Sequence, residues 1–224
     1  MLRKRIERRA WHMVRWGALG LCFALTTHAA QAETQQAAMT PRFADVLQSQ
    51  QHRDTVLAAA RHSMTWIRHG CQSASFTPDT GVRVWRWPEF DLGGQPVAGA
   101  WGEAVRADGC GIARVLNVLT YVRTAGALVS GPLAPGDTTA DPTLQRDASQ
   151  HAFTAALTHV PGCRQAYLDD TRFVSRTAPA RPDPRLTGPV TLEHWTVIAC
   201  GTPVVVDVQF LPVGHGTDIV ARAP

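Results

Sequence analysis

The chain contains a stretch that resembles a second stretch at a constant offset of ninety residues. Residues 103–129 align with residues 193–219 without a gap, with six identities in 27 positions where chance gives roughly two. We therefore expect two versions of one structural unit. The identical pairs are Glu103/Glu193, Cys110/Cys200, Gly111/Gly201, Val115/Val205, Val118/Val208 and Gly126/Gly216.

The N-terminus has the pattern of a secretion signal. A basic stretch precedes an apolar run at 16–25, and Ala30-Gln31-Ala32 gives the small-x-small pattern of a cleavage site. The apolar run is too short to span a membrane stably. We therefore expect residues 1–32 to be a signal peptide, the mature protein to begin at Glu33, and the protein to be periplasmic or secreted.

Four cysteines follow the signal, and an even number in an exported chain predicts two disulfides. Four cysteines allow three pairings. Cys71 lies 39 residues before Cys110, and Cys163 lies 37 residues before Cys200. Because equivalent units should close equivalent loops, we favour Cys71–Cys110 and Cys163–Cys200.

The charge balance changes when the signal is removed. The whole chain has 22 basic and 18 acidic residues, of which residues 1–32 hold six and one, so 16 basic and 17 acidic residues remain. This balance gives no electrostatic reason to expect nucleic acid or an anionic membrane as a partner. We expect no nucleic-acid binding and no stable membrane insertion after the signal is cleaved.

Helix patterns open each unit and strand patterns follow. Thr40-Pro41 starts the first helix and Gly70 ends it, with the polar patch 48–52 as a break point. Asp141-Pro142 starts the second helix, and Pro161-Gly162 stops it. The expected strands cover 71–76, 81–87, 101–107 and 113–123 in the first unit, and 164–168, 171–176, 191–198, 204–211 and 218–221 in the second.

These patterns predict an α+β protein of two related units, each a helix followed by an antiparallel, strand-rich segment stapled by a disulfide. Val115 and Val118 are expected to face a core as Val205 and Val208 do. The expected organisation is a disordered leader at 33–39, a first unit at 40–130, a linker at 131–140 and a second unit at 141–224. The hairpin at 113–130, the helix at 142–159 and the strand at 163–168 also follow the order that resembles TonB-like C-terminal domains, a likeness of fold alone.

The sequence contains no compact catalytic motif. Gly-x-Ser-x-Gly, a phosphate-binding glycine loop, Cys-x-x-Cys and His-Glu-x-x-His are all absent. The histidine pairs His62/His69 and His151/His159 lack the one-turn spacing of metal ligands. We therefore expect no metal, no cofactor and no catalytic nucleophile.

Glu103 and Glu193 each stand seven residues before a cysteine. As a functional pair they would be acids of a twofold-related site, but catalysis needs a second group and no His or Ser recurs with them. We interpret them as strand-edge carboxylates that meet arginine side chains.

Residues 83–87 (Arg-Val-Trp-Arg-Trp) are the best candidate for a binding surface. On a regular strand Arg83, Trp85 and Trp87 share one face. Tryptophan and arginine on one face can stack a sugar, an aromatic ligand or a partner's side chain. The alternative is that both tryptophans fill the core under the first helix, since the second unit has no such pair.

The favoured function is that of an exported, non-enzymatic binding or assembly protein whose partner is an envelope protein or a glycan. The alternative is an exported hydrolase with a scattered His/Asp/Glu site. A cleft with converging polar groups and strongly shifted acids would favour the hydrolase, and a flat apolar patch or an open strand edge would favour the binding module.

Overall fold

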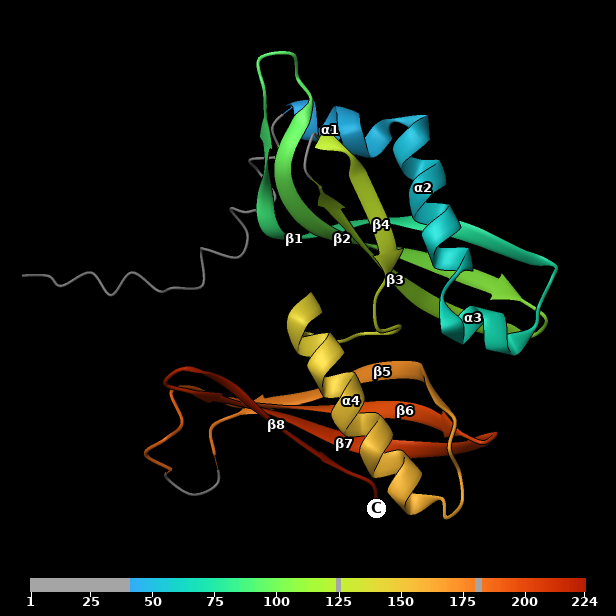
Figure 1. The fold of residues 1–224 in the computed structure, drawn as a ribbon, viewed down its shortest axis with the longest axis vertical. Coiled ribbons are helices and arrows are strands. Elements are labelled where there is room, and N and C mark those ends of the chain that lie inside the picture. Colours follow the sequence, from blue (N-terminus) through green and yellow to red (C-terminus); the bar gives the residue numbers. More distant parts are fainter. Residues whose placement is uncertain (1–40, 124–125, 180–182) are drawn as a thin grey trace, which may run out of the picture. The chain divides into compact units, whose positions relative to one another are not determined.

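The computed structural model describes residues 41–123, 126–179 and 183–224 (Figure 1). The expected signal peptide and leader lie outside the described residues. Thr40 to Pro224 form one compact unit, which contains two four-stranded antiparallel sheets and has a mixed α+β fold. None of the helices described is long and apolar enough to cross a membrane.

Three short helices precede the first sheet. The first break falls in the expected polar patch, where the side chain of Ser49 accepts a hydrogen bond from the backbone N–H of His52 and begins the second helix. Ser63 begins the third helix in the same way, and Gly70 ends it with φ of 67° in the left-handed region. The helices are α1 (Pro41–Gln48), α2 (Gln50–Arg61) and α3 (Met64–His69).

The first sheet has the strand order β1-β2-β3-β4. Helices α2 and α3 supply Val56, Ala60 and Trp66 to a core that includes Val105 and Leu116 of the sheet. Each strand pairs with the next along the chain, as in a meander. The strands are β1 (Ala74–Phe90), β2 (Pro96–Gly109), β3 (Ile112–Val122) and β4 (Leu128–Pro132).

Two expectations for this sheet are wrong. The strands expected at 71–76 and 81–87 are parts of the single strand β1, because an irregularity between Pro78 and Val82 interrupts the pattern without ending the pairing with β2. Strand β4 was not among the expected strands, although the hairpin expected at 113–130 overlaps its first residues. It has five residues, too few for a period-two pattern to stand out.

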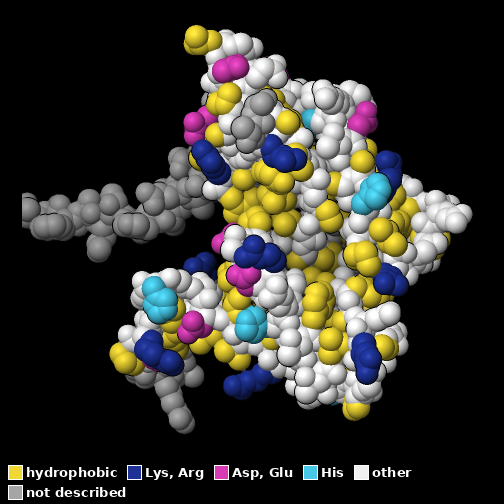
Figure 2. All heavy atoms as spheres, viewed as in Figure 1, with side chains coloured by type: hydrophobic (Ala, Val, Ile, Leu, Met, Phe, Trp, Pro, Cys, Tyr) yellow, Lys and Arg dark blue, Asp and Glu magenta, His cyan; other side chains and the backbone are white. Residues whose placement is uncertain are grey.

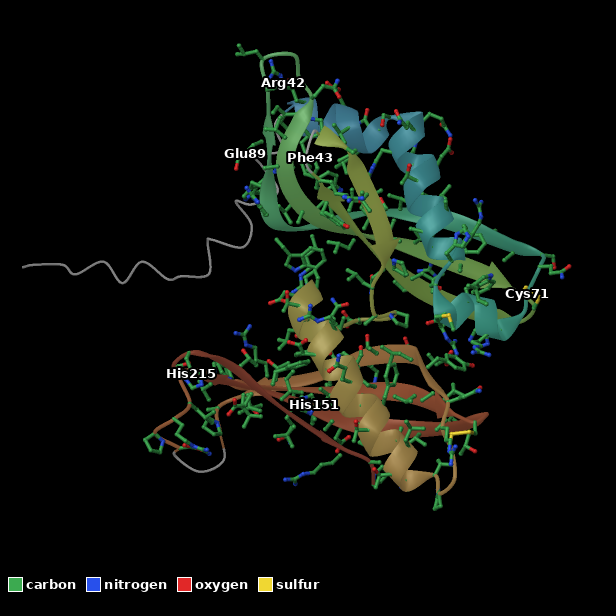
Figure 3. All side chains as sticks on the ribbon, in the orientation of Figure 1. Arg42, Phe43, Cys71, Glu89, His151 and His215 are labelled. Atoms are coloured by element: carbon green, nitrogen blue, oxygen red, sulfur yellow. A yellow bond between two sulfur atoms is a disulfide. The ribbon has the colours of Figure 1, made fainter. Side chains whose placement is uncertain are left out.

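The second half also contains a helix followed by a four-stranded meander. Asp141 begins the helix by accepting from the N–H of Leu144. Ala148, Ala152 and Ala156 are fully buried against the sheet, whereas His151 is exposed on the helix (Figure 3). The elements are α4 (Pro142–His159), β5 (Ala166–Thr177), β6 (Val190–Ala199), β7 (Thr202–Val213) and β8 (Gly216–Arg222), with strand order β5-β6-β7-β8.

Strand β7 alternates as its sequence predicts. Val204, Val206 and Val208 are buried under α4, and Val205 is 45% exposed. The strands expected at 164–168 and 171–176 are one strand, β5, with a β-bulge between Leu168 and Asp170. Since β5 belongs to the second sheet and pairs with neither β3 nor β4, the resemblance to TonB-like domains is wrong.

Two disulfides close the loops that the spacing favoured. Cys71 and Cys110 have Cα atoms 5.9 Å apart, and those of Cys163 and Cys200 are 5.8 Å apart. In each half the second cysteine lies in the turn after the second strand, with positive φ of 52° at Cys110 and 49° at Cys200. The glycine that follows also has positive φ, which is the geometry of a type I′ hairpin turn. Two disulfides fit a protein of an oxidising compartment, either periplasmic or extracellular.

The central hairpins of the two sheets have the same register at the ninety-residue offset. Glu103 pairs with Val118, and Glu193 pairs with Val208. Both valines are fully buried, whereas Val115 is 36% and Val205 45% exposed. The expectation that Val115 and Val205 face a core is therefore wrong, because residues three apart on a strand lie on opposite faces.

Candidate binding site

A cavity of about 700 Å³ lies against the face of the first sheet that α2 and α3 do not cover. Its walls come from β1, β2 and β3, from the segment 133–138 and from β5. The residues used below are Arg83, Trp85, Arg114, Asn117, Asp170 and Arg172. In the space-filling view, apolar side chains gather over the first sheet, with arginine and carboxylate side chains at their border (Figure 2).

A β-bulge in β1 separates the three residues of the sequence-predicted binding surface. Val84 pairs with Trp101 and Arg86 with Ala100, so Trp85 is an extra residue in the ladder. Arg83 and Trp85 line the cavity, and Trp87 does not. Trp87 instead contacts Phe43 on the helix side, with ring centroids 6.5 Å apart, and is 44% exposed. The expectation that all three share a face is wrong because the bulge shifts the alternation by one residue.

Trp85 is held by a close approach to β2. A Cβ atom on Gly102 would lie 2.4 Å from the Trp85 ring, so glycine makes room for the indole. The guanidinium carbon of Arg83 lies 5.4 Å from the ring centroid, a cation–π geometry. The indole N–H of Trp85 is buried and has no hydrogen-bond partner among the described residues. This nitrogen has almost no accessible surface, so the open cavity does not expose it.

Arg83 connects the first sheet to the segment that enters the second half. Its guanidinium donates to the backbone carbonyl of Thr138 at 3.1 Å and to that of Thr139. Within the described ranges it forms no ion pair with a carboxylate. Its positive charge therefore stands beside the cavity without a neutralising partner.

Asn117 and Gly136 fix the segment 133–138 along β3. The Asn117 side-chain amide donates to the carbonyls of Ala134 at 2.7 Å and Gly136 at 2.9 Å. Gly136 has a φ of 87°, and a Cβ atom there would lie 2.2 Å from the carbonyl oxygen of Thr171. Only glycine fits at this position, and the segment forms a parallel bridge from Asp137 to Arg172 of β5.

Asp170 and Arg172 form the wall contributed by β5. They pair with Thr196 and His194, so both side chains point to the same face of the second sheet. Arg172 contacts the Nδ1 atom of His194 at 3.3 Å. Neither residue forms an ion pair in the part of the chain that the structure describes. The two side chains thus carry opposite charges in the cavity but form no ion pair with each other.

Burial raises the pKa of the Asp170 carboxyl above its ordinary value of 3.8. The backbone N–H of Thr171 and the positive charges of Arg114 and Arg172 act in the opposite direction, and the negative charge of Asp169 raises the pKa further. The ionised carboxylate is thus less well solvated in the folded protein than in water.

We expect the Asp170→Asn variant to melt at a higher temperature than the wild type at pH 7. A carboxyl with a raised pKa contributes stability at low pH and loses it as the pH rises from 3.8 through the folded-state value. The advantage of the variant should therefore disappear near pH 3. Thermal unfolding of both proteins across this range measures it, and an advantage that grows toward low pH would contradict the assignment.

Arg114 belongs to a polar cluster that joins the two halves. Asp169 is 5% exposed and accepts from Arg114 Nη2 and His69 Nε2, each at 2.8 Å. Thr65 on α3 also donates to the carbonyl of Leu168 at 2.7 Å. The Nε of Arg114 is also buried and lacks a partner within the described residues.

Glu103 and Glu193 bind tryptophan side chains rather than arginine. The Trp101 indole donates to Glu103 at 3.0 Å, and the Trp195 indole donates to Glu193 at 2.9 Å. Glu193 is fully buried and also accepts from the backbone and the hydroxyl of Thr139, at 2.7 and 2.8 Å. The interpretation as strand-edge carboxylates that meet arginine is therefore wrong, because each glutamate points into a core.

Glu103 has a second partner, His52 of α2. The Nε2 atom of His52 lies 2.7 Å from Glu103 Oε1, and His52 is 2% exposed. Its Nδ1 atom has no hydrogen-bond partner in the described residues. His52 also lines a separate cavity of about 570 Å³ beside α1, together with Ser49 and Gln95. A buried histidine and a carboxylate thus meet next to this cavity.

Sequence reasoning found Arg83 and Trp85 and missed Arg114, Asp170 and Arg172. Arg114 and Arg172 lie on strands that the sequence predicted, and Asp170 lies between two of them. The contact between β3 and β5 is long-range and leaves no local pattern. In the ranges described, no group of three or more His, Cys, Asp or Glu residues is arranged to hold a metal ion. His151 and His215 lie on α4 and in the β7–β8 turn (Figure 3).

Comparisons with known proteins give no relative from which a function could be carried over. No family model matches the chain, and no curated protein or solved structure does so either. The functional argument therefore rests on the cavity and its wall.

Proposed function

We propose that this is an exported, non-enzymatic binding protein that holds a small organic ligand carrying a carboxylate group in the cavity beside Trp85. The observation that carries the proposal is a pair of arginine side chains in the wall. Arg83 and Arg172 line the cavity and form no ion pair with a carboxylate among the described residues. A ligand carboxylate can accept hydrogen bonds from such guanidinium groups.

The cavity also has an apolar component. Trp85, Ala104, Val115 and Leu133 line it, and Val115 is 36% exposed. Binding sites for small molecules combine such apolar walls with a few polar groups that fix orientation. An aromatic acid or an acidic sugar would use the ring face of Trp85 together with the arginines.

An internal repeat is part of the proposal. The two sheets have the same strand order, the same hairpin register and the same placement of the second cysteine in a type I′ turn. The cavity residues Arg83 and Trp85 have no counterpart in the second half. Ligand binding would therefore be a property of the first unit that the second unit lacks. Export is supported by the two disulfides and by the pattern of residues 1–32.

We expect Trp85→Phe to weaken binding of an acidic ligand by about tenfold, because it removes part of the stacking surface. Benzoate and oligogalacturonate are suitable probes, measured by calorimetric titration. Trp87→Phe is the matched control, since Trp87 lies outside the cavity and its contact with Phe43 survives in phenylalanine. Equal losses in both variants would contradict the proposal, and so would a wild type that binds neither these probes nor a zwitterionic carboxylate such as phenylalanine.

The second candidate function is a hydrolase, and the observation in its favour is the pair His52–Glu103. A glutamate that orients a buried histidine beside a cavity is the arrangement of a general base. A set of nitrophenyl esters and glycosides tests this function. Turnover by the wild type that disappears in His52→Gln, with the fold retained, would replace binding by catalysis.

A further inference from the structure

The charges of Asp170 and Arg172 restrict the class of ligand further, because neither side chain forms an ion pair among the described residues. The two residues are neighbours on the same face of β5, which places their Cβ atoms roughly 6–7 Å apart. Each lines the cavity. The guanidinium of Arg172 contacts the Nδ1 atom of His194, and Asp170 accepts no side-chain hydrogen bond in the described part of the chain.

A simple anion would satisfy only half of this wall. It would pair with Arg172 and would be repelled by Asp170, and a simple cation would face the opposite problem. A ligand with both charges on neighbouring atoms satisfies both groups at once, since each charge of the wall finds an opposite charge. The smallest organic molecules of this kind are amino acids and the termini of short peptides.

We propose that the ligand of this cavity is a zwitterion of the amino-acid or short-peptide class, whose carboxylate pairs with Arg172 and whose ammonium group pairs with Asp170. This inference rests on the proposed function and narrows its ligand class from carboxylates in general to zwitterions. The Trp85 ring and the apolar residues beside it receive the side chain of the ligand, and a phenyl ring suits them.

Three related probes separate the two charges. Phenylalanine carries both, N-acetylphenylalanine retains the acid alone, and phenylalanine amide retains the ammonium group alone. Calorimetric titration of the disulfide-bonded protein at pH 7 should show phenylalanine binding, with each of the other two weaker by about tenfold or more. Both enantiomers are titrated, since the wall does not define the handedness of the ligand.

Charge-removing variants test which residue holds which group. Asp170→Asn should weaken phenylalanine and phenylalanine amide by about tenfold while leaving N-acetylphenylalanine unchanged. Arg172→Gln should weaken phenylalanine and N-acetylphenylalanine while leaving the amide unchanged, and Arg172→Lys should restore part of the affinity. Arg176→Gln and Asp108→Asn are controls, since both residues are exposed and neither lines the cavity. Circular dichroism and melting temperatures verify that each variant is folded.

The outcomes distinguish this inference from the proposed function. N-acetylphenylalanine could bind as tightly as phenylalanine, with the same affinity for the wild type and for Asp170→Asn. The ligand is then a simple acid, so the zwitterion proposal is overturned and the acid-binding function stands. If phenylalanine amide binds as tightly as phenylalanine and its affinity is unchanged in Arg172→Gln, both the zwitterion proposal and the acid-binding function are overturned. The same holds if none of the three probes binds at concentrations up to about 10 mM.

Discussion

Replacement of Glu193 by alanine is expected to lower the free energy of unfolding by about 3–5 kcal/mol. The carboxylate is fully buried and accepts from three donors, the Trp195 indole and the backbone and hydroxyl of Thr139. Alanine leaves these donors without an acceptor, and an unsatisfied buried donor costs about 1–3 kcal/mol. Chemical denaturation followed by circular dichroism measures the change.

Two further variants are compared with Glu193→Ala by their loss of unfolding free energy. Glu193→Gln keeps the shape and one acceptor oxygen, so its loss should be smaller, about 1–3 kcal/mol. Glu89→Ala removes a side chain that is 66% exposed and should change stability by less than about 0.5 kcal/mol. A Glu193→Ala protein that unfolds at the same denaturant concentration as Glu89→Ala would show that the three hydrogen bonds contribute nothing.

Removal of either disulfide by paired Cys→Ser substitution is expected to destabilise the oxidised protein by about 4 kcal/mol. The loops of 39 and 37 residues are almost equal, and in the chain-entropy model the loss depends on loop length alone. The Cys71/Cys110 and Cys163/Cys200 double variants should therefore have nearly the same midpoint of denaturation.

The wild type with both disulfides reduced is the reference for this measurement, since it should be less stable than either double variant. A large loss for one pair and none for the other would mean that strain or residual structure of the unfolded chain outweighs loop closure in one half. It would also weaken the case that the halves are equivalent.

The sequence predicts most of the local structure because the signals are local. Asp141-Pro142 begins α4, Gly70 ends α3, and the period-two pattern of β7 matches its burial. The disulfide pairing followed from the correspondence of the two stretches, which concerns spacing rather than contacts. Each of these predictions depends on residues a few positions apart or on the similar spacing of two stretches of the sequence.

The candidate site was predicted only in part, and the reasons are physical. The bulge at Trp85 is a change in hydrogen-bond pairing with β2, which a strand pattern does not report, so Trp87 was assigned to the wrong face. The hydrogen bonds that Thr139 donates to Glu193 and the approach of Asp170 to the first sheet depend on tertiary packing. Such contacts join residues more than thirty positions apart in the sequence.

The order of the cysteines along the chain has a consequence for how the protein matures. Each disulfide joins cysteines that are consecutive in the sequence, and Cys110 precedes Cys163 by more than fifty residues. A chain that enters an oxidising compartment N-terminus first therefore presents one complete pair before the third thiol emerges. Oxidation in order of emergence yields the native connectivity directly, without the slow reshuffling that interleaved pairs require.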